Sequence, residues 1–119
     1  MQSHLVDLAG HTREVYLHVD LDGLDPEVAP GIVDPPSPGG LSLSQLDDLI
    51  RAAARTFRLR AAAVTTYDPH RDPDRRTLRA ALHIIRLLAA WAEEDGATTI
   101  PQSRLSPRCA AASGDDVDG

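Results

Sequence analysis

The chain has 119 residues, a formal net charge of −6 and a pI near 5.2. This fits one acidic domain and disfavours a nucleic-acid partner, because nucleic-acid binders usually present a basic face. Its apolar stretches are too short to span a bilayer, its N-terminus lacks the pattern of a signal peptide, and its only cysteine, Cys109, excludes a disulfide framework. These features predict a cytoplasmic protein without nucleic-acid or membrane partners.

The first third of the chain combines a strand pattern with a long loop. Residues 1–13 show no clear period, so we expect an irregular lead-in. Residues Glu14–Asp20 are rich in β-branched and aromatic side chains and end in an Asp/Gly cluster, which predicts a strand. Residues 21–40 hold five prolines and four glycines, which is typical of a stiff loop. Long ordered loops in compact domains are often functional, so this loop is a candidate site region.

A helix is predicted next, capped by Ser42 or Ser44. Its apolar residues recur at helical spacing and form one stripe: Leu43, Leu46, Leu49, Ile50 and Ala53. A mostly apolar strand is predicted over 59–66, and this pattern is typical of a parallel strand that is buried on both faces.

A second helix is predicted over 74–94. Its expected buried side consists of Leu78, Leu82, Ile85, Leu88 and Ala89. The acidic residues 93–95 end this helix against its macrodipole, which predicts fraying. Periodicity is lost beyond Gly96, and residues 96–119 are predicted to form a disordered tail.

The order strand, helix, strand, helix predicts an α/β fold with a parallel sheet. Two parallel strands alone leave open edges and uncovered faces. A stable parallel sheet therefore requires more strands than this sequence contains.

Three carboxylates, Asp20, Asp22 and Asp25, fall within six residues at the C-terminal end of the first strand. Ligands of open α/β sheets bind at this end of the strands. Like charges this close repel one another unless a cation is present, and the Asp-x-Asp spacing directs two side chains to the same side. Carboxylate oxygens suit Mn²⁺ or Mg²⁺, so this spacing fits either a metal site or a solvated turn without an ion.

The run VYLHVDLDGLDPEVAPG (15–31), followed by PGGLS (38–42), resembles the arginase, agmatinase and formiminoglutamase family of ureohydrolases. The segment AVTTYDP (63–69) is similar to the family's next strand end, and the resemblance covers roughly residues 14–90. It implies a parallel-sheet, three-layer αβα arginase-like fold, truncated here to a βαβα unit, with residues 14–95 as the C-terminal part of the domain.

The resemblance further implies a binuclear Mn²⁺ hydrolase that cleaves a C–N bond of a linear guanidine or amidine with a metal-bridging hydroxide. Asp20 would bridge both ions and Asp22 would chelate one of them. Asp25 has no metal role in the family and is expected to brace the turn through backbone amides. Thr66 would line the pocket, and His18, which shares a strand face with Asp20, is either a hydrogen-bond partner of a metal ligand or a packed histidine.

Two departures from the family pattern limit these implications. The earlier ligand motifs, a Gly-Gly-Asp-His-type turn and an Asp-Ala-His-x-Asp-type strand end, are absent from this sequence, as is the family's acid/base histidine. We therefore expect weak metal binding and no activity from the chain alone. Arginases carry a Glu where this chain has Thr65–Thr66, which disfavours arginine as the substrate.

Two functional hypotheses follow. The first is a truncated ureohydrolase with a small guanidino or amidino substrate, which acts as a homo-oligomer or with a complementing chain. The second is a non-catalytic structural or interaction remnant of the same fold. A sugar-nucleotide transferase interpretation of Asp-x-Asp is weaker, because nothing else in the sequence supplies a sugar-nucleotide pocket.

Overall fold

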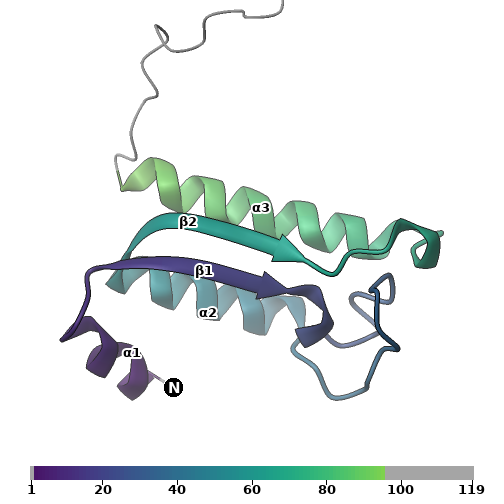
Figure 1. Cartoon of the computed structure of the whole chain (residues 1–119), viewed down its shortest axis with the longest axis horizontal. Helices are drawn as coiled ribbons and strands as arrows, with labels where there is room; N and C mark the ends of the chain where they lie inside the picture. Colours follow the sequence, from purple (N-terminus) through teal and green to yellow (C-terminus); the bar gives the residue numbers. More distant parts are fainter. Residues whose placement is uncertain (1, 96–119) are drawn as a thin grey trace, which may run out of the picture.

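The computed structural model describes residues 2–95 and is shown in Figure 1. Its helices and strands follow the predicted strand–helix–strand–helix order, with an additional N-terminal helix. The elements are α1 (Gln2–Ala9), β1 (Glu14–Asp20), the 3₁₀ helix η1 (Leu21–Gly23), α2 (Leu43–Thr56), β2 (Arg58–Thr65), the 3₁₀ helix η2 (Pro69–Arg71) and α3 (Arg76–Glu94). The tail expected over 96–119 lies outside the described residues.

The two strands pair in parallel along their whole length, which confirms the predicted pairing. Glu14 lies opposite Arg58 and Asp20 lies opposite Thr65, with one irregularity at the start of β1. Because the strands run in the same direction, as the arrows in Figure 1 show, their C-terminal ends meet at one edge of the sheet. This register brings Asp20 next to the residues that follow β2.

Helix α2 begins at a capping box. Of the two serines expected to cap it, Ser42 does so: its side chain accepts the Gln45 N–H at 3.1 Å, while the Gln45 side chain accepts the Ser42 N–H at 2.9 Å. The predicted stripe faces inward, with Leu46 and Ile50 buried. Both the start of this helix and the face that it buries were therefore predictable from its sequence.

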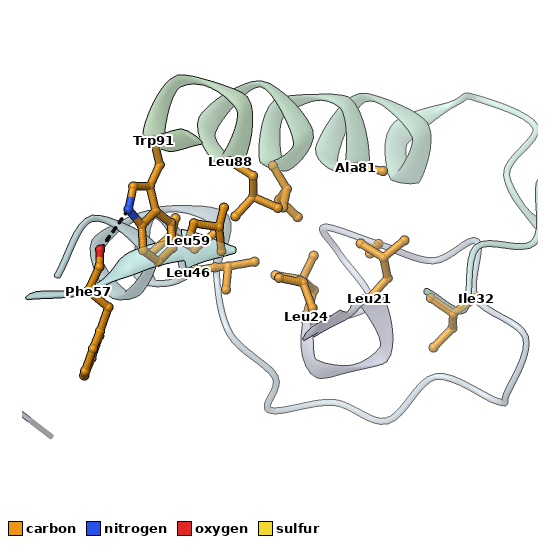
Figure 2. Packing of buried hydrophobic residues seen from close by; sticks show 13 residues of the cluster. Leu21, Leu24, Ile32, Leu46, Phe57, Leu59, Ala81, Leu88 and Trp91 are labelled. Atoms are coloured by element: carbon orange, nitrogen blue, oxygen red, sulfur yellow. Dashed lines mark hydrogen bonds between the residues drawn. The ribbon is translucent and has the colours of Figure 1, made fainter. Parts of the chain in front are cut away.

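One hydrophobic core joins the sheet to α2 and α3 (Figure 2). Leu59 of β2, Leu46 of α2 and Leu88 of α3 point into it, and the Trp91 indole N–H donates to the Phe57 carbonyl at 3.1 Å. Burial of each large apolar side chain stabilises the fold by roughly 1.5–3 kcal/mol. The core therefore fixes both helices against the strands, with the strand ends left free for a site.

The inward face of α3 differs from the expected one. Leu88 is buried as expected, but Leu82 and Ile85 are 41% and 47% exposed. The buried residues of this helix are instead Thr77, Ala80, Ala81, Ile84, Leu88 and Trp91. The helix carries apolar residues on more than one face, and contact with α2 and the sheet selects the Ile84 face. Ile85 lines an open depression beside β2, where no described element covers it.

The prediction that the second strand is buried on both faces was also wrong. Leu59 is buried, whereas Arg60, Ala61 and Ala62 are exposed. On the first strand, Tyr16 is likewise 58% exposed. The reason is that the sheet of the described chain has only two strands, so it leaves edges and a face without neighbours.

Two further expectations need correction. Residues 1–13 are not irregular throughout, because α1 packs on the core through Leu5 and Ala9, which lie one helical turn apart, and the His11 Nδ1 donates to the Asp7 carbonyl at 2.9 Å. The end of α3 is not frayed either. The Asp95 carboxylate accepts the Leu59 N–H at 3.1 Å and so ties the helix end to the start of β2.

The long loop between β1 and α2 is held against the end of β2. Gly31 donates its N–H to the buried Thr77 hydroxyl at 2.7 Å, and Val33 donates to the Thr66 carbonyl at 3.0 Å. A Cβ on Gly31 would lie 2.5 Å from the Asp72 Cβ, so only glycine allows this approach. The loop is therefore fixed beside the strand ends.

Candidate metal centre

Asp20 and Asp22 lie together where β1 ends. The Asp20 Oδ1 accepts the Asp22 N–H at 3.2 Å, which caps the short helix η1. It also accepts the Thr66 hydroxyl at 2.6 Å, a contact from the end of β2. Both carboxylates are exposed. The parallel pairing thus brings together three residues named as site candidates from the sequence.

Thr66 adopts an unusual backbone conformation, with φ of 73°. A β-branched residue at positive φ is a genuine outlier, and such a conformation costs on the order of 1–3 kcal/mol. The hydrogen bond from Val33 to the Thr66 carbonyl and the bond from its hydroxyl to Asp20 hold it there. The strained residue therefore lies where the loop, the end of β2 and the candidate ligand meet.

The two carboxylates differ in their affinity for protons. The hydrogen bond from Thr66, with that from the Asp22 N–H, lowers the pKa of Asp20 against the opposing effect of desolvation. Partial desolvation raises the pKa of Asp22, and the charges of Asp20 and Asp34 add to this rise. The turn accumulates negative charge, and a bound cation would relieve the repulsion. Asp34 was not singled out from the sequence, where it was one more acid in a Pro-rich loop.

Asp25 forms the bonds expected of a turn brace. Its carboxylate accepts the Glu27 N–H at 3.0 Å and the Gly39 N–H at 3.1 Å. Gly39 has φ of 92°, a conformation that favours glycine. Asp25 thereby links the two ends of the loop and leaves Asp20 and Asp22 as the carboxylates at the strand end.

His18 is exposed, and its Nε2 shares a hydrogen bond of 2.8 Å with the Thr65 hydroxyl. Its ring lies 6.3 Å from that of Tyr16. The interpretation as a packed histidine is therefore wrong, because the sheet face that carries His18 has no cover in the described chain. The observed partner is Thr65, which neighbours Thr66 at the same strand end.

The fit to a manganese pair can be tested on the donors present. Within residues 2–95, no group of three or more His, Cys, Asp or Glu side chains converges on one point. Two carboxylates offer hard oxygen donors of the right kind but too few to hold two divalent ions against water. By itself the described chain therefore does not fit a binuclear centre.

The sequence of residues 1–90 matches the model of the arginase family. The chain belongs to this family. Among its curated relatives, it is 38% identical to the formimidoylglutamase of Paraburkholderia xenovorans over 82 residues, which cover 69% of this chain and 25% of that protein. It is 33% identical to the formimidoylglutamase of Aeromonas salmonicida over 86 residues, covering 72% and 27%. The chain thus spans about a quarter of the length of these relatives.

Solved structures of the family resemble the fold. A hypothetical agmatinase from Burkholderia thailandensis superposes with a TM-score of 0.69 and 30% identity, covering 82% of this chain and 31% of that one. The native arginase from Bacillus caldovelox gives a TM-score of 0.64 and 28% identity, covering 71% and 28%. The described residues therefore form an α/β arginase-like unit that corresponds to 31% and 28% of these two structures. None of the described helices has the length and apolar character needed to cross a membrane.

Proposed function

We propose that this chain supplies one side of the metal centre of a ureohydrolase that cleaves a C–N bond of a linear amidine or guanidine. In this proposal Asp20 and Asp22 are manganese ligands, Thr66 orients Asp20, and His18 and Asp25 support the strand end and the turn. The observation that carries it is the hydrogen-bonded Asp20–Asp22–Thr66 cluster at the C-terminal ends of two parallel strands, in a chain of the arginase family.

The remaining donors would come from a part of the protein outside this sequence or from a complementing chain. The free edge of β1 supports this idea. A depression of about 330 Å³ lies along that edge, with an apolar wall that includes Leu17, Leu46 and Ile50 and a polar end at His18 and Asp20. A further strand added there would bury the apolar wall and end beside the carboxylates. We propose a cytoplasmic enzyme that is inactive until this surface is covered, by such a partner or by another copy.

For the substrate we favour a formimino compound over arginine. The relatives at 38% and 33% identity are formimidoylglutamases. Thr66 is neutral and its hydroxyl is directed to Asp20, so it offers no negative charge to a guanidinium. The alternative function, a non-catalytic remnant, is favoured by the incomplete donor set.

A chimera separates the two functions. Residues 1–95 would replace the matching segment of the Paraburkholderia xenovorans formimidoylglutamase, and hydrolysis of formimidoylglutamate would be measured with added Mn²⁺. The proposal predicts activity in the chimera and none in the isolated chain. An Asp20→Asn/Asp22→Asn chimera should lose activity by more than about 100-fold, because changing only the residues that support metal ligands already costs about 10–100-fold.

The matched control is Asp48→Asn/Glu93→Gln, which removes the same charge from exposed helical positions and should leave activity unchanged. A chimera that folds and binds Mn²⁺ but remains inactive would favour a non-catalytic remnant. Retained activity in the Asp20→Asn/Asp22→Asn chimera would refute the ligand assignment.

A further inference from the structure

A second hollow lies at the opposite end of the strands from the carboxylates, beside the first residues of β1 and β2. Both strands begin at the left in Figure 1. It has a volume of about 730 Å³ and is formed by the end of α1, the end of α2 and the first residues of both strands. Three arginines line it: Arg13, Arg55 and Arg58. The hollow thus carries three guanidinium groups in a chain whose formal net charge is −6.

The acidic residues of this hollow already have partners. Glu14 pairs with Arg60 at 3.8 Å, and the Asp95 carboxylate accepts the Leu59 N–H. Among residues 2–95, none of the ion pairs includes Arg13, Arg55 or Arg58. All three arginines are exposed. The hollow thus presents guanidinium groups, which suit carboxylate ligands through paired N–H donors.

We propose that the acidic end of this same chain, the sequence GDDVDG over 114–119, binds in the arginine-lined hollow. Two features favour this occupant. The chain leaves the described structure at Asp95, a residue of the hollow itself, so the connection starts at its rim. The segment offers three carboxylates, Asp115, Asp116 and Asp118, to three guanidinium groups.

Chain length permits the contact. The residues between Asp95 and this segment, 96–113, have a maximum reach of roughly 60 Å, which is ample to return to the hollow at Asp95. Tethering gives the segment an effective concentration on the order of millimolar at the hollow. Exposed ion pairs are individually weak, so tethering is what makes three of them sufficient. The site is independent of the metal centre, which lies at the other end of the strands.

The single cysteine makes the test direct, because Cys109 lies close to the acidic end and can carry a nitroxide. Paramagnetic broadening of backbone amides would be measured on the full chain. We expect it at Thr12–Glu14 and Thr56–Arg58, and little at Asp20–Gly23 on the far end. Because the tether alone brings the label near the hollow, the decisive comparison is with Asp115→Asn/Asp116→Asn/Asp118→Asn. Broadening at the hollow should be about fivefold weaker in that variant.

The arginines provide the reciprocal test. Replacing Arg13, Arg55 and Arg58 by Gln should weaken the broadening to the same extent. Raising the ionic strength to about 1 M, which shortens the screening length to about 3 Å, should do so as well.

A matched control removes an equal charge from exposed positions on α2 and α3, at Arg51, Arg79 and Arg86, and should change nothing. Unchanged broadening in the Asn variant would overturn the proposal. Two other outcomes would do the same. One is broadening carried from a labelled chain to a separate, unlabelled one. The other is an equal response of the hollow to inorganic phosphate in the native chain and the Asn variant, since an occupying segment must compete with phosphate.

Discussion

The turn after β2 buries its carboxylate, whereas the turn after β1 leaves its two carboxylates exposed. Asp72 is 3% exposed and accepts hydrogen bonds from the N–H groups of Thr77 and Leu78, both at 2.9 Å, and from the Tyr67 hydroxyl at 3.1 Å. Burial raises the pKa of Asp72, but these hydrogen bonds outweigh it and the net pKa is lowered. Its partners are all supplied within the chain.

Asp20 and Asp22 present the opposite case. The pKa of Asp20 is lowered, whereas the pKa of Asp22 is raised, first by partial desolvation and then by the negative charges of Asp20 and Asp34. This contrast separates structural from functional carboxylates. A carboxylate satisfied by backbone donors holds the fold, whereas neighbouring carboxylates left with mutual repulsion indicate a site that something else completes.

The largest expected effect is a loss of stability when the buried carboxylate of Asp72 is removed. Asp72→Ala would leave the N–H groups of Thr77 and Leu78 without their acceptor at the start of α3. We expect a loss of about 3 kcal/mol in the free energy of unfolding, measured by urea denaturation of the full chain. Asp48→Ala, at an exposed position of α2, should change it by less than about 0.5 kcal/mol. Equal losses in the Asp72→Ala and Asp48→Ala variants would show that the buried carboxylate contributes no more to stability than an exposed one.

An intermediate effect on stability is expected at Thr66, which follows β2 and contacts the exposed turn after β1. Thr66→Gly and Thr66→Ala both remove the hydroxyl that donates to Asp20, but only glycine accepts a φ of 73° without strain. Thr66→Gly should therefore be more stable than Thr66→Ala by about 1 kcal/mol in the same denaturation experiment. An alanine variant as stable as the glycine variant would show that the backbone carries no strain at this position.

The smallest effect is a pH dependence of opposite sign at the two turns. A raised pKa in the folded state means that Asp22 favours folding below the ordinary carboxyl pKa of about 4 and opposes it as pH rises through the folded pKa. Asp22→Asn should thus slightly stabilise the chain at pH 7 and lose this advantage below pH ~4.

The reverse holds for Asp72, whose lowered pKa favours folding above pH ~4 and loses its contribution as pH falls through the folded pKa. Asp72→Asn should destabilise the chain at pH 7 and do so less in acid. Denaturation at pH 7 and pH 3 compares the two variants, and the same sign of pH dependence in both would contradict the assignment.

Much of the candidate site followed from local pattern. The strand Glu14–Asp20 was predicted at its observed bounds, because β-branched residues and the following Asp/Gly cluster mark both ends. Ser42 was one of two predicted caps, and Asp25 forms the brace expected of it. These features depend on contacts within one strand, at one helix start or within one loop. Such local contacts can be predicted from the pattern of residue types.

The predictions that were wrong share a different cause. Leu82 and Ile85 were expected to be buried, and β2 was expected to have cover on both faces, because apolar pattern reports what a segment can bury and not whether a neighbour is present. The role of Asp72 was not recognised either, since its partners depend on how α3, the long loop and β2 come together.

Local sequence pattern was enough to predict both strands, the helices α2 and α3 and the capped start of α2, and to single out Asp20 and Asp22, because propensity, capping and turn chemistry act over short distances. Only the tertiary structure decided that Thr66 reaches Asp20, that α3 turns its Ile84 face inward and that three arginines surround one hollow. Those contacts join residues that lie far apart in the chain, and parallel pairing together with the packing of α2 and α3 sets them.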